Sequence, residues 1–383
     1  MATNKTRIGW IDEFKGFVLL LVCLFHIEQN FPNAHLGMWH LSALRMSAFF
    51  FISGFLFSTK RFSDFKSYFI HKTKVLLIPY LYLSLLFFAI DPVVYNFALY
   101  PKSPTMTVVN TIPDINNTWQ YIYWNIAKIF IAGKSSVGAG PLWFVFTLYS
   151  VSLLFYFLHQ ASYKFVNRTM FITVMAIEGL LCGWLLNINH MHLPLGIERD
   201  LTILFFFGCG WLCKEPIKKI HSAISAGAAH AAKNTAIVAA IGIASFGAYA
   251  FLESPSPNFS IMNNDLGKSL PQFVASSITG IIGLVATFLL ASKIPDIAPI
   301  RICKGILRNI SRNALVILAV HWWIVLILRL FFRQQINQPG IAYIAIPIVA
   351  LGTIAAIPLF RCRLYKLLGK EKISVRESLN IRE

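Results

Sequence analysis

The chain has 383 residues, of which 56% are hydrophobic and only 13% are charged, and its mean hydropathy is +0.63. Soluble globular domains average about 45–50% apolar and about 25% charged residues, so this composition excludes an ordinary soluble protein. The formal net charge of +18 would suggest a nucleic-acid partner in a soluble chain. Here the basic residues lie in short segments between apolar runs, which indicates membrane topology and no nucleic-acid binding.

Ten apolar runs follow one another along the chain. A hydrocarbon core about 30 Å thick requires about 20 apolar residues in a helix. We therefore predict an all-α, polytopic transmembrane bundle with about ten spanning helices, in which the first run carries charges and the sixth is short. The predicted spans lie near residues 11–28, 40–58, 73–91, 141–159, 169–188, 198–213, 235–252, 271–292, 312–332 and 341–360. We assign residues 1–360 to one transmembrane domain and residues 361–383 to a basic cytoplasmic tail.

The distribution of lysine and arginine predicts the orientation. With the N-terminus in the cytoplasm, 25 of the 34 basic residues fall in cytoplasmic segments and 6 in outer loops, and Lys15, Arg45 and Arg329 fall within spans. Cytoplasmic loops of membrane proteins carry an excess of such residues. We therefore predict that both termini lie on the cytoplasmic side.

Two outer segments differ from the spans. Residues 119–132 are aromatic-rich but short, which favours an interfacial or re-entrant helix over a span. They belong to the long outer element 92–140, rich in Pro, Asn and Thr, which either shapes an entrance to a site or serves as a plain connector.

The first span carries the most informative polar residues. Lys15 and His26 are 11 residues apart, about 16.5 Å of rise and about 20° past three full turns, so they lie on one helix face. Asp12 precedes Lys15 by three positions and can pair with it, and Glu28 can orient His26. The plainer alternatives are that His26 bonds a neighbouring helix and that Lys15 extends to the interface.

Other ionisable groups inside spans are functional candidates because their burial in lipid is costly. Arg45 lies about one turn into the second span, where its guanidinium needs an anion such as a substrate or Glu28. Glu178 and His321 are deep in the fifth and ninth spans, and Arg329 near the outer end of the ninth can be a structural anchor.

Residues 60–74 form the densest basic cluster and end in His71, Lys72, Thr73 and Lys74 at the start of the third span. Basic side chains and free backbone amides at a helix N-terminus suit a phosphate. The cluster is equally explained as a plain topology determinant.

The six cysteines imply neither disulfides nor a metal site. Most lie in apolar segments or on the predicted cytoplasmic side. Cys209 and Cys213 are one helical turn apart, but no histidine or second pair completes a metal site, so we predict no metal.

Six motifs, in order along the chain, together resemble membrane acyltransferase family 3, whose members O-acylate surface polysaccharides. Lys15 and His26 match the family's basic residue, ten residues and histidine, and they follow the typical aspartate in WIDEFKG. The remaining matches are FFFISGFLF (49–57), HKTKVLLIPY (71–80), GPLWFV (140–145), LFFFGCGWL (204–212) and SRNALVILAVH (311–321). The sequence WIDEFKG is most similar to that of the branch of sugar O-acetylases.

The resemblance implies an enzyme of the bacterial cytoplasmic (inner) membrane that uses acyl-CoA, most often acetyl-CoA, as donor and a glycan or lipid-linked saccharide as acceptor. It implies that His26 is the general base and that Arg45 stabilises the oxyanion or positions the sugar. Asp12 and Lys15 would order the donor entrance, with Glu28 beside His26. The basic cluster, His71, Lys72 and Lys74, would meet the CoA phosphates. Trp143, Glu178 and His321 would bind substrate, with Trp143 stacking on a sugar ring.

Two departures from the family bear on the substrates. The usual basic pair before Pro-Tyr is His71 and Lys74 here, which alters the phosphate contacts because lysine lacks the bidentate geometry of arginine. Arg45 stands where many relatives of the sugar-acetylase branch have histidine, a difference that affects which acceptor the resemblance implies.

Two other functions remain as alternatives. A polysaccharide or small-molecule exporter also needs charges within the membrane. A covalent role for Ser53 is the other, although a Ser-Gly pair in a Phe-rich helix is usually explained by close packing. The predicted partners are the lipid bilayer and the saccharide acceptor, and the sequence leaves a homo-oligomer open.

Overall fold

The fold is built entirely from helices, as predicted. The computed structural model describes residues 9–31, 33–99, 115–131, 133, 136–225, 228–253, 259–338, 340–374 and 378. Within these residues there is no strand beyond an isolated bridge between Ser260 and Asp265. The α-helices are α1 (Gly9–Asn30), α2 (Ser42–Phe55), α3 (Phe65–Lys72), α4 (Ile78–Phe88), α5 (Asp91–Asn96), α6 (Thr118–Ile131), α7 (Trp143–Ala161), α8 (Arg168–Ile188), α9 (Ile197–Leu212), α10 (Lys214–Ser225), α11 (Ala228–Leu252), α12 (Leu270–Ala291), α13 (Ala298–Arg312), α14 (Ala314–Phe331) and α15 (Ile341–Pro358). Short 3₁₀ or π turns are η1 (Met38–Leu41), η2 (Thr73–Leu77), η4 (Gly140–Leu142), η5 (Ser162–Lys164), η6 (Pro194–Gly196), η7 (Ile261–Asn263), η8 (Leu359–Arg363) and η9 (Tyr365–Leu368).

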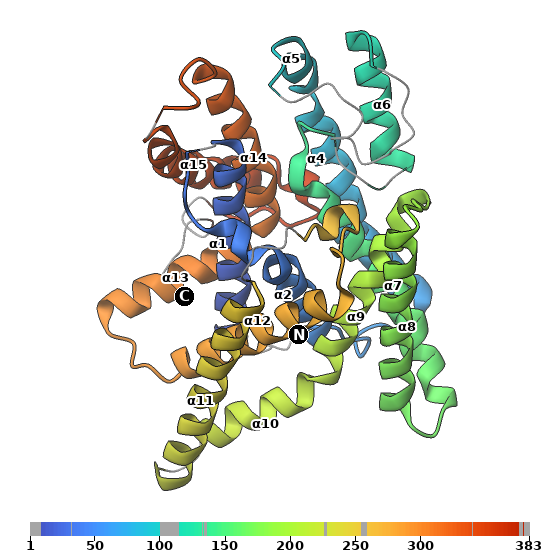
Figure 1. The fold of residues 1–383 in the computed structure, drawn as a ribbon, viewed down its shortest axis with the longest axis vertical. Helices are drawn as coiled ribbons and strands as arrows, with labels where there is room; N and C mark the ends of the chain where they lie inside the picture. The colour runs from blue at the N-terminus through green and yellow to red at the C-terminus, as the bar shows by residue number, and fades with distance from the viewer. Residues whose placement is uncertain are drawn as a thin grey trace.

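Helices α1 and α2 run through the middle of this arrangement (Figure 1). Helices α7, α8 and α9 lie on one side of them, and α13, α14 and α15 lie on the other. Helices α5 and α6 stand at one end of the molecule, and α10 with one end of α11 forms the opposite end.

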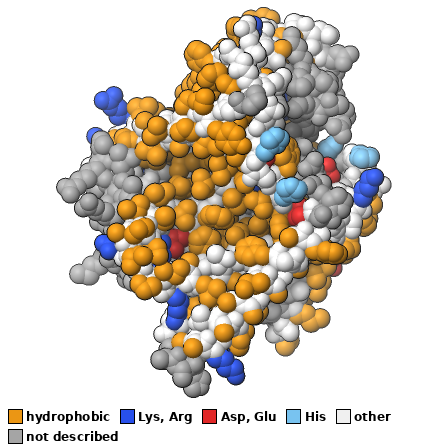
Figure 2. All heavy atoms as spheres, turned by 60° about the vertical axis from the view of Figure 1, so that its left-hand side comes forward, with side chains coloured by type: hydrophobic (Ala, Val, Ile, Leu, Met, Phe, Trp, Pro, Cys, Tyr) orange, Lys and Arg blue, Asp and Glu red, His pale blue; other side chains and the backbone are white. Residues whose placement is uncertain are grey.

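Seven helical segments in the described residues are long and apolar enough to cross a bilayer, and they correspond to seven of the ten predicted spans. Their outer faces carry apolar side chains, as lipid contact requires. Figure 2 shows one face of the molecule on which hydrophobic side chains cover the middle and most lysines and arginines lie near the margin. The seven segments are Phe65–Phe88, Gly140–Lys164, Arg168–Ile188, Ala231–Leu252, Leu270–Ala291, Ala314–Phe331 and Ile341–Arg363.

The other three predicted spans, 11–28, 40–58 and 198–213, are not confirmed. Helix α1 has 22 residues, but it carries Asp12, Glu13, Lys15 and Glu28. Helices α2 and α9 have only 14 and 16 residues. At about 1.5 Å per residue they are about 21 and 24 Å long, shorter than a hydrocarbon core of about 30 Å. The prediction of about ten spanning helices is therefore not confirmed.

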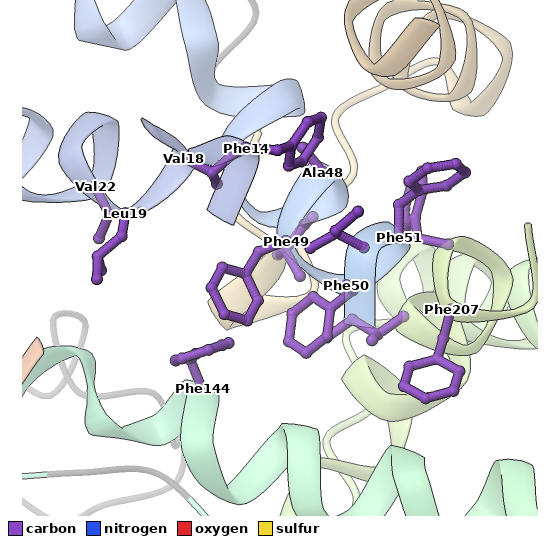
Figure 3. Close-up of a cluster of buried hydrophobic side chains, with 14 of the residues drawn as sticks. Phe14, Val18, Leu19, Val22, Ala48, Phe49, Phe50, Phe51, Phe144 and Phe207 are labelled. Atoms are coloured by element: carbon purple, nitrogen blue, oxygen red, sulfur yellow. The ribbon is translucent and has the colours of Figure 1, made fainter. Parts of the chain in front are cut away.

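These three helices form the centre of the hydrophobic core. Their side chains meet in a phenylalanine-rich cluster, which Phe144 of α7 joins (Figure 3). Helices α2 and α9 cross at glycines: a methyl group on Gly54 would overlap the Phe207 carbonyl, and one on Gly210 would overlap the Phe51 carbonyl. Small residues allow helix backbones to approach this closely. Gly54 of the FFFISGFLF motif is thus explained by close packing. The Ser53 hydroxyl beside it donates to the Phe49 carbonyl of its own helix.

The third predicted span begins earlier than residue 73. Helix α3 starts at Phe65 because the Asp64 side chain accepts a hydrogen bond from the Ser67 amide at 2.7 Å and caps the helix. The π turn η2 then joins α3 to α4 without a break. Turns of this kind shift the helical register and often occur at functional sites.

Helix α6 occupies the segment predicted to be interfacial or re-entrant. It has 14 residues, too few to cross a bilayer, and its Trp119 and Tyr123 side chains are exposed. Much of the rest of the predicted outer element, residues 100–114, lies outside the described residues.

The described part of the predicted tail packs against the helices. Leu368 is buried, and Gly369 adopts a left-handed conformation against the Lys74 carbonyl. The Lys370 ammonium donates to the Arg312 carbonyl at 2.9 Å. Residues 368–370 therefore contact η2 and the C-terminal end of α13.

Candidate functional site

Two histidines predicted from different spans lie together. The His26 ring of α1 and the His321 ring of α14 have centroids 5.4 Å apart, and the Trp322 ring lies 4.8 Å from His26. His321 is buried and His26 is half-buried. We call His26, Arg45, His321 and Trp322 the histidine site.

The hydrogen-bonding contacts of the two rings indicate which ring nitrogen carries the proton when the imidazole is neutral. His321 Nδ1 lies within hydrogen-bonding distance of the Ile317 carbonyl, which can only accept, so Nδ1 carries the proton and Nε2 keeps a lone pair. That Nε2 atom is buried and has no hydrogen-bond partner in the described part of the chain. His26 Nδ1 lies 3.2 Å from Gln29 Oε1, and when Gln29 accepts, His26 Nε2 is also the unprotonated nitrogen.

The residue that bonds the His26 ring is Gln29, whereas sequence reasoning assigned this role to Glu28. Positions 26 and 28 point about 200° apart on a helix, whereas position 29 is on the same side as position 26. The Glu28 carboxylate accepts from the backbone amides of Leu36 and Gly37 at 2.9 Å and of Met38 at 2.6 Å. Glu28 therefore shapes the turn between α1 and η1.

Arg45 connects to the same turn. Its guanidinium donates to the Met38 carbonyl and lies 3.8 Å from the centroid of the Phe25 ring. Phe25 in turn packs on His26, with ring centroids 5.3 Å apart. The Arg45 side chain is only 6% exposed, so its charge acts where water screens it little.

The predicted donor residues lie on α3 and η2. Gly369 and Lys370 connect η2 to the C-terminal end of α13. That end of α13 contacts α1 at Asp12, about 16 Å or more from His26 along the helix.

The Arg61 guanidinium bonds His71 Nε2 at 2.9 Å, and Lys72 lies 5.4 Å from the centre of the Tyr68 ring. Lys74 is exposed. We call Arg61, His71, Lys72 and Lys74 the basic face.

Asp12 and Lys15 lie near the N-terminal end of α1, away from His26. Asp12 accepts a hydrogen bond from the Ser311 hydroxyl of α13 at 3.2 Å, and Lys15 is half-buried one turn later. The neighbouring Glu13 is buried and pairs with Arg308 at 2.6 Å. These contacts fix α1 against α13.

The two remaining predicted residues have different surroundings. Glu178 is exposed on α8 and is not part of either cluster. Trp143 is buried at the start of α7, and the Arg199 guanidinium lies 5.2 Å from its ring.

Sequence reasoning missed Arg199 and Asp200, which are 0% and 5% exposed at the start of α9. They lie at the start of a predicted span, where charged residues of the adjoining loop are common. The signal that was available is that a short apolar helix opens with three charged residues, Glu198, Arg199 and Asp200.

Within the described residues, no group of three or more His, Cys, Asp or Glu side chains is placed to bind a metal ion. All six cysteines are free, including Cys209 and Cys213. The arrangement instead offers unprotonated imidazole nitrogens beside a buried guanidinium, which suits proton transfer next to a developing negative charge.

Comparison with known proteins gives one match. A family model described as an acyltransferase domain, that of membrane acyltransferase family 3, matches residues 8–360. No curated protein and no solved structure matches the chain.

Proposed function

Because this chain belongs to membrane acyltransferase family 3 and is a multi-pass membrane acyltransferase, we propose that it moves an acetyl group from acetyl-CoA to a hydroxyl of a surface glycan or lipid-linked saccharide. The hydroxyl oxygen attacks the thioester carbonyl, a C–O bond forms and the C–S bond breaks. The hydroxyl proton passes to an imidazole and then to the departing CoA thiolate.

The observation that carries this proposal is the proximity of the His26 and His321 rings, whose centroids lie 5.4 Å apart. A general base must present a lone pair to the reacting hydroxyl at a neutral pH, which a neutral imidazole does. The Gln29 contact supports a lone pair on His26 Nε2, so we assign His26 as the base. His321 Nε2, which has no partner within the described residues, accepts a hydrogen bond from a second hydroxyl of the acceptor.

Arg45 supplies positive charge near the reacting carbonyl. The tetrahedral intermediate carries an oxyanion, and a fixed donor in a water-poor site stabilises it strongly. The Phe25 ring and the Met38 carbonyl hold the guanidinium, while Glu28 fixes the turn that carries Met38.

The basic face binds the CoA phosphates. Lys72 and Lys74 provide positive charge, and His71 contributes together with Arg61. Asp12 and Lys15 order this donor entrance where α1 meets α13. We place this face in the cytoplasm of a bacterium and the histidine site towards the outer side of the inner membrane, because the lysine and arginine count favours that orientation.

On the acceptor side, Trp143 offers a ring on which a sugar can stack. We give Glu178 no role in this scheme, because its exposed position on α8 is away from the other groups. The exporter alternative is not favoured, because the family to which the chain belongs is one of acyltransferases.

The test is acetyl transfer by the purified full-length protein in detergent, with [¹⁴C]acetyl-CoA and a panel of free and lipid-linked sugars. We expect His26→Ala to lower the turnover number by about 10²–10⁴, the usual contribution of a general base. The matched control is His35→Ala, which removes an exposed histidine nine residues later. Undiminished transfer by His26→Ala would exclude His26 as the base, and sugar transport without acetyl-CoA turnover would favour an exporter.

A further inference from the structure

Arg199 and Asp200 form a second buried polar cluster, next to Trp143. The Arg199 side chain is fully buried, and its Nη2 atom donates to the Gly133 carbonyl at 3.3 Å. Its Nε and Nη1 atoms have no partner within the described residues. Asp200 Oδ2 accepts from the Ser150 hydroxyl, and Asp200 Oδ1 has no partner there either.

Such a cluster needs an explanation, because nearly all buried polar atoms in folded proteins are hydrogen-bonded. A guanidinium with two unused donors next to a carboxylate with an unused oxygen is costly to bury. The local backbone also accommodates it: Gly196 has a φ of 73°, and a Cβ there would lie 2.5 Å from Arg199 Nη2. Gly133, which accepts the Arg199 bond, also has a positive φ of 56°.

One turn of the chain, η4, connects this cluster to the histidine site. Gly140 opens η4 against the Trp322 ring, and its positive φ of 46° lets the backbone approach that ring. Trp322 packs on His26, and its indole N–H donates to the Val137 carbonyl at 2.6 Å. Trp143 follows η4 directly and faces Arg199. The two polar clusters therefore flank the same turn.

The charges of the cluster select the kind of ligand. Two acidic residues, Glu198 and Asp200, accompany one guanidinium, so the cluster has no excess positive charge that would attract a phosphate or another anion. Glu198 is occupied, because its Oε2 accepts from the Leu193 amide at 3.0 Å. The unused atoms are donors on Arg199 and an acceptor on Asp200. A ligand that satisfies both must donate and accept, as hydroxyl groups do.

We propose that Arg199, Asp200 and Trp143 form a subsite for an uncharged saccharide ring, which holds the acceptor so that its reacting hydroxyl reaches His26. Arg199 donates to one sugar oxygen, a neighbouring hydroxyl donates to Asp200 Oδ1, and the apolar face of the ring packs on the Trp143 indole. This inference rests on the proposed acyl transfer and specifies the acceptor class.

The experiment measures sugar binding and acetyl transfer separately. Saturation-transfer NMR on the full-length protein in lipid nanodiscs gives dissociation constants for glucose, galactose, rhamnose, N-acetylglucosamine and the anion glucuronate. We expect at least one neutral sugar to bind about tenfold or more tightly than glucuronate. We expect Asp200→Asn to weaken neutral-sugar binding about tenfold and to reduce the discrimination against glucuronate, because it removes an acidic acceptor beside the Arg199 guanidinium.

Two further variants keep the test decisive. Trp143→Leu removes the ring face without changing the charge, so we expect weaker sugar binding with unchanged discrimination against glucuronate. Glu215→Gln removes an exposed carboxylate of α10 and should change neither quantity. Thermal unfolding of each variant identifies loss of fold, and if Asp200→Asn does not fold, Trp143→Leu decides.

Each outcome separates the subsite from the acyl transfer. The subsite is overturned if the wild type binds none of the neutral sugars, or if the folded variants bind them as the wild type does. Acetyl transfer to a sugar-free alcohol in the absence of sugar binding would overturn the subsite and leave the acyltransferase intact. Sugar binding without acetyl-CoA turnover would leave the subsite and overturn the acetyl-CoA proposal.

Discussion

The basic face and the histidine site hold similar residue types at opposite ends of α1, yet their surroundings differ. At the basic face Arg61 and Lys74 are exposed and His71 and Lys72 are half-buried. At the histidine site Arg45 and His321 are buried among aromatic rings. Exposed charges act over a distance and are screened by salt, whereas buried ones act at short range through fixed geometry.

This difference predicts a division of labour. Groups at the basic face should contribute to capture of a charged donor, which appears in KM and in its dependence on salt. Groups at the histidine site should contribute to the reaction itself, which appears in kcat. Single substitutions at each end test this division, and one at the helix crossing tests whether both ends depend on the same core.

Among these three substitutions, the largest effect is expected for Arg45→Met. This substitution removes the buried positive charge while keeping an unbranched side chain, so the oxyanion loses its stabilising group. We expect kcat to fall by about 10²–10³, a change typical for loss of one oxyanion donor, with the KM for acetyl-CoA little changed. Initial rates with [¹⁴C]acetyl-CoA measure both constants.

The matched variant is Arg45→Lys, which keeps the charge but loses the planar guanidinium on Phe25. We expect partial recovery of kcat. A rise in the KM for acetyl-CoA with constant kcat in Arg45→Met would contradict the division and assign Arg45 to donor binding.

An intermediate effect is expected at the crossing of α2 and α9 in the hydrophobic core. Gly54→Ala forces a methyl group into the Phe207 carbonyl, so we expect a loss of about 1–3 kcal/mol of folding free energy, as overpacking usually costs. Thermal unfolding in detergent measures the change. Gly247→Ala on α11 is the control, because a Cβ there meets no atom within 4 Å.

The loss of stability expected for Gly54→Ala should be absent in Gly247→Ala. Alanine is the better helix former by about 1 kcal/mol, so Gly247→Ala should hold or raise the unfolding temperature. Equal unfolding temperatures for Gly54→Ala and the wild type would show that the crossing is looser than the structure has it.

Much of the histidine site could be predicted from the sequence, because an ionisable side chain in an apolar run is conspicuous. His26, Arg45 and His321 were identified on that ground, and the structure brings His26 and His321 together. The contact of Gln29 with His26 could not be chosen over Glu28 by charge alone, since helical geometry decides between neighbouring positions.

The central position of α2 and α9 could not be predicted from hydropathy. A buried helix and a lipid-facing helix are equally apolar, and only their lengths of 14 and 16 residues separate them. The burial of Arg199 could not be predicted for a related reason. Its burial depends on turns at Gly133 and Gly196, one of which is 66 residues away along the chain.

The smallest effect is expected for Lys72→Gln at the basic face. Loss of one charge on a half-buried side chain should raise the KM for acetyl-CoA about tenfold or less, because a single phosphate contact is worth about 1–1.5 kcal/mol in a hydrated setting. The kcat should stay unchanged, since the reacting groups lie at the other end of α1. Added salt should weaken donor binding more in the wild type than in the variant, because fewer charges remain to be screened. Lys66→Gln, on the exposed side of α3, is the control and should leave KM as it is. If Lys66→Gln raises KM as much as Lys72→Gln, the field of the whole basic segment attracts the donor, and the phosphate contact assigned to Lys72 is wrong.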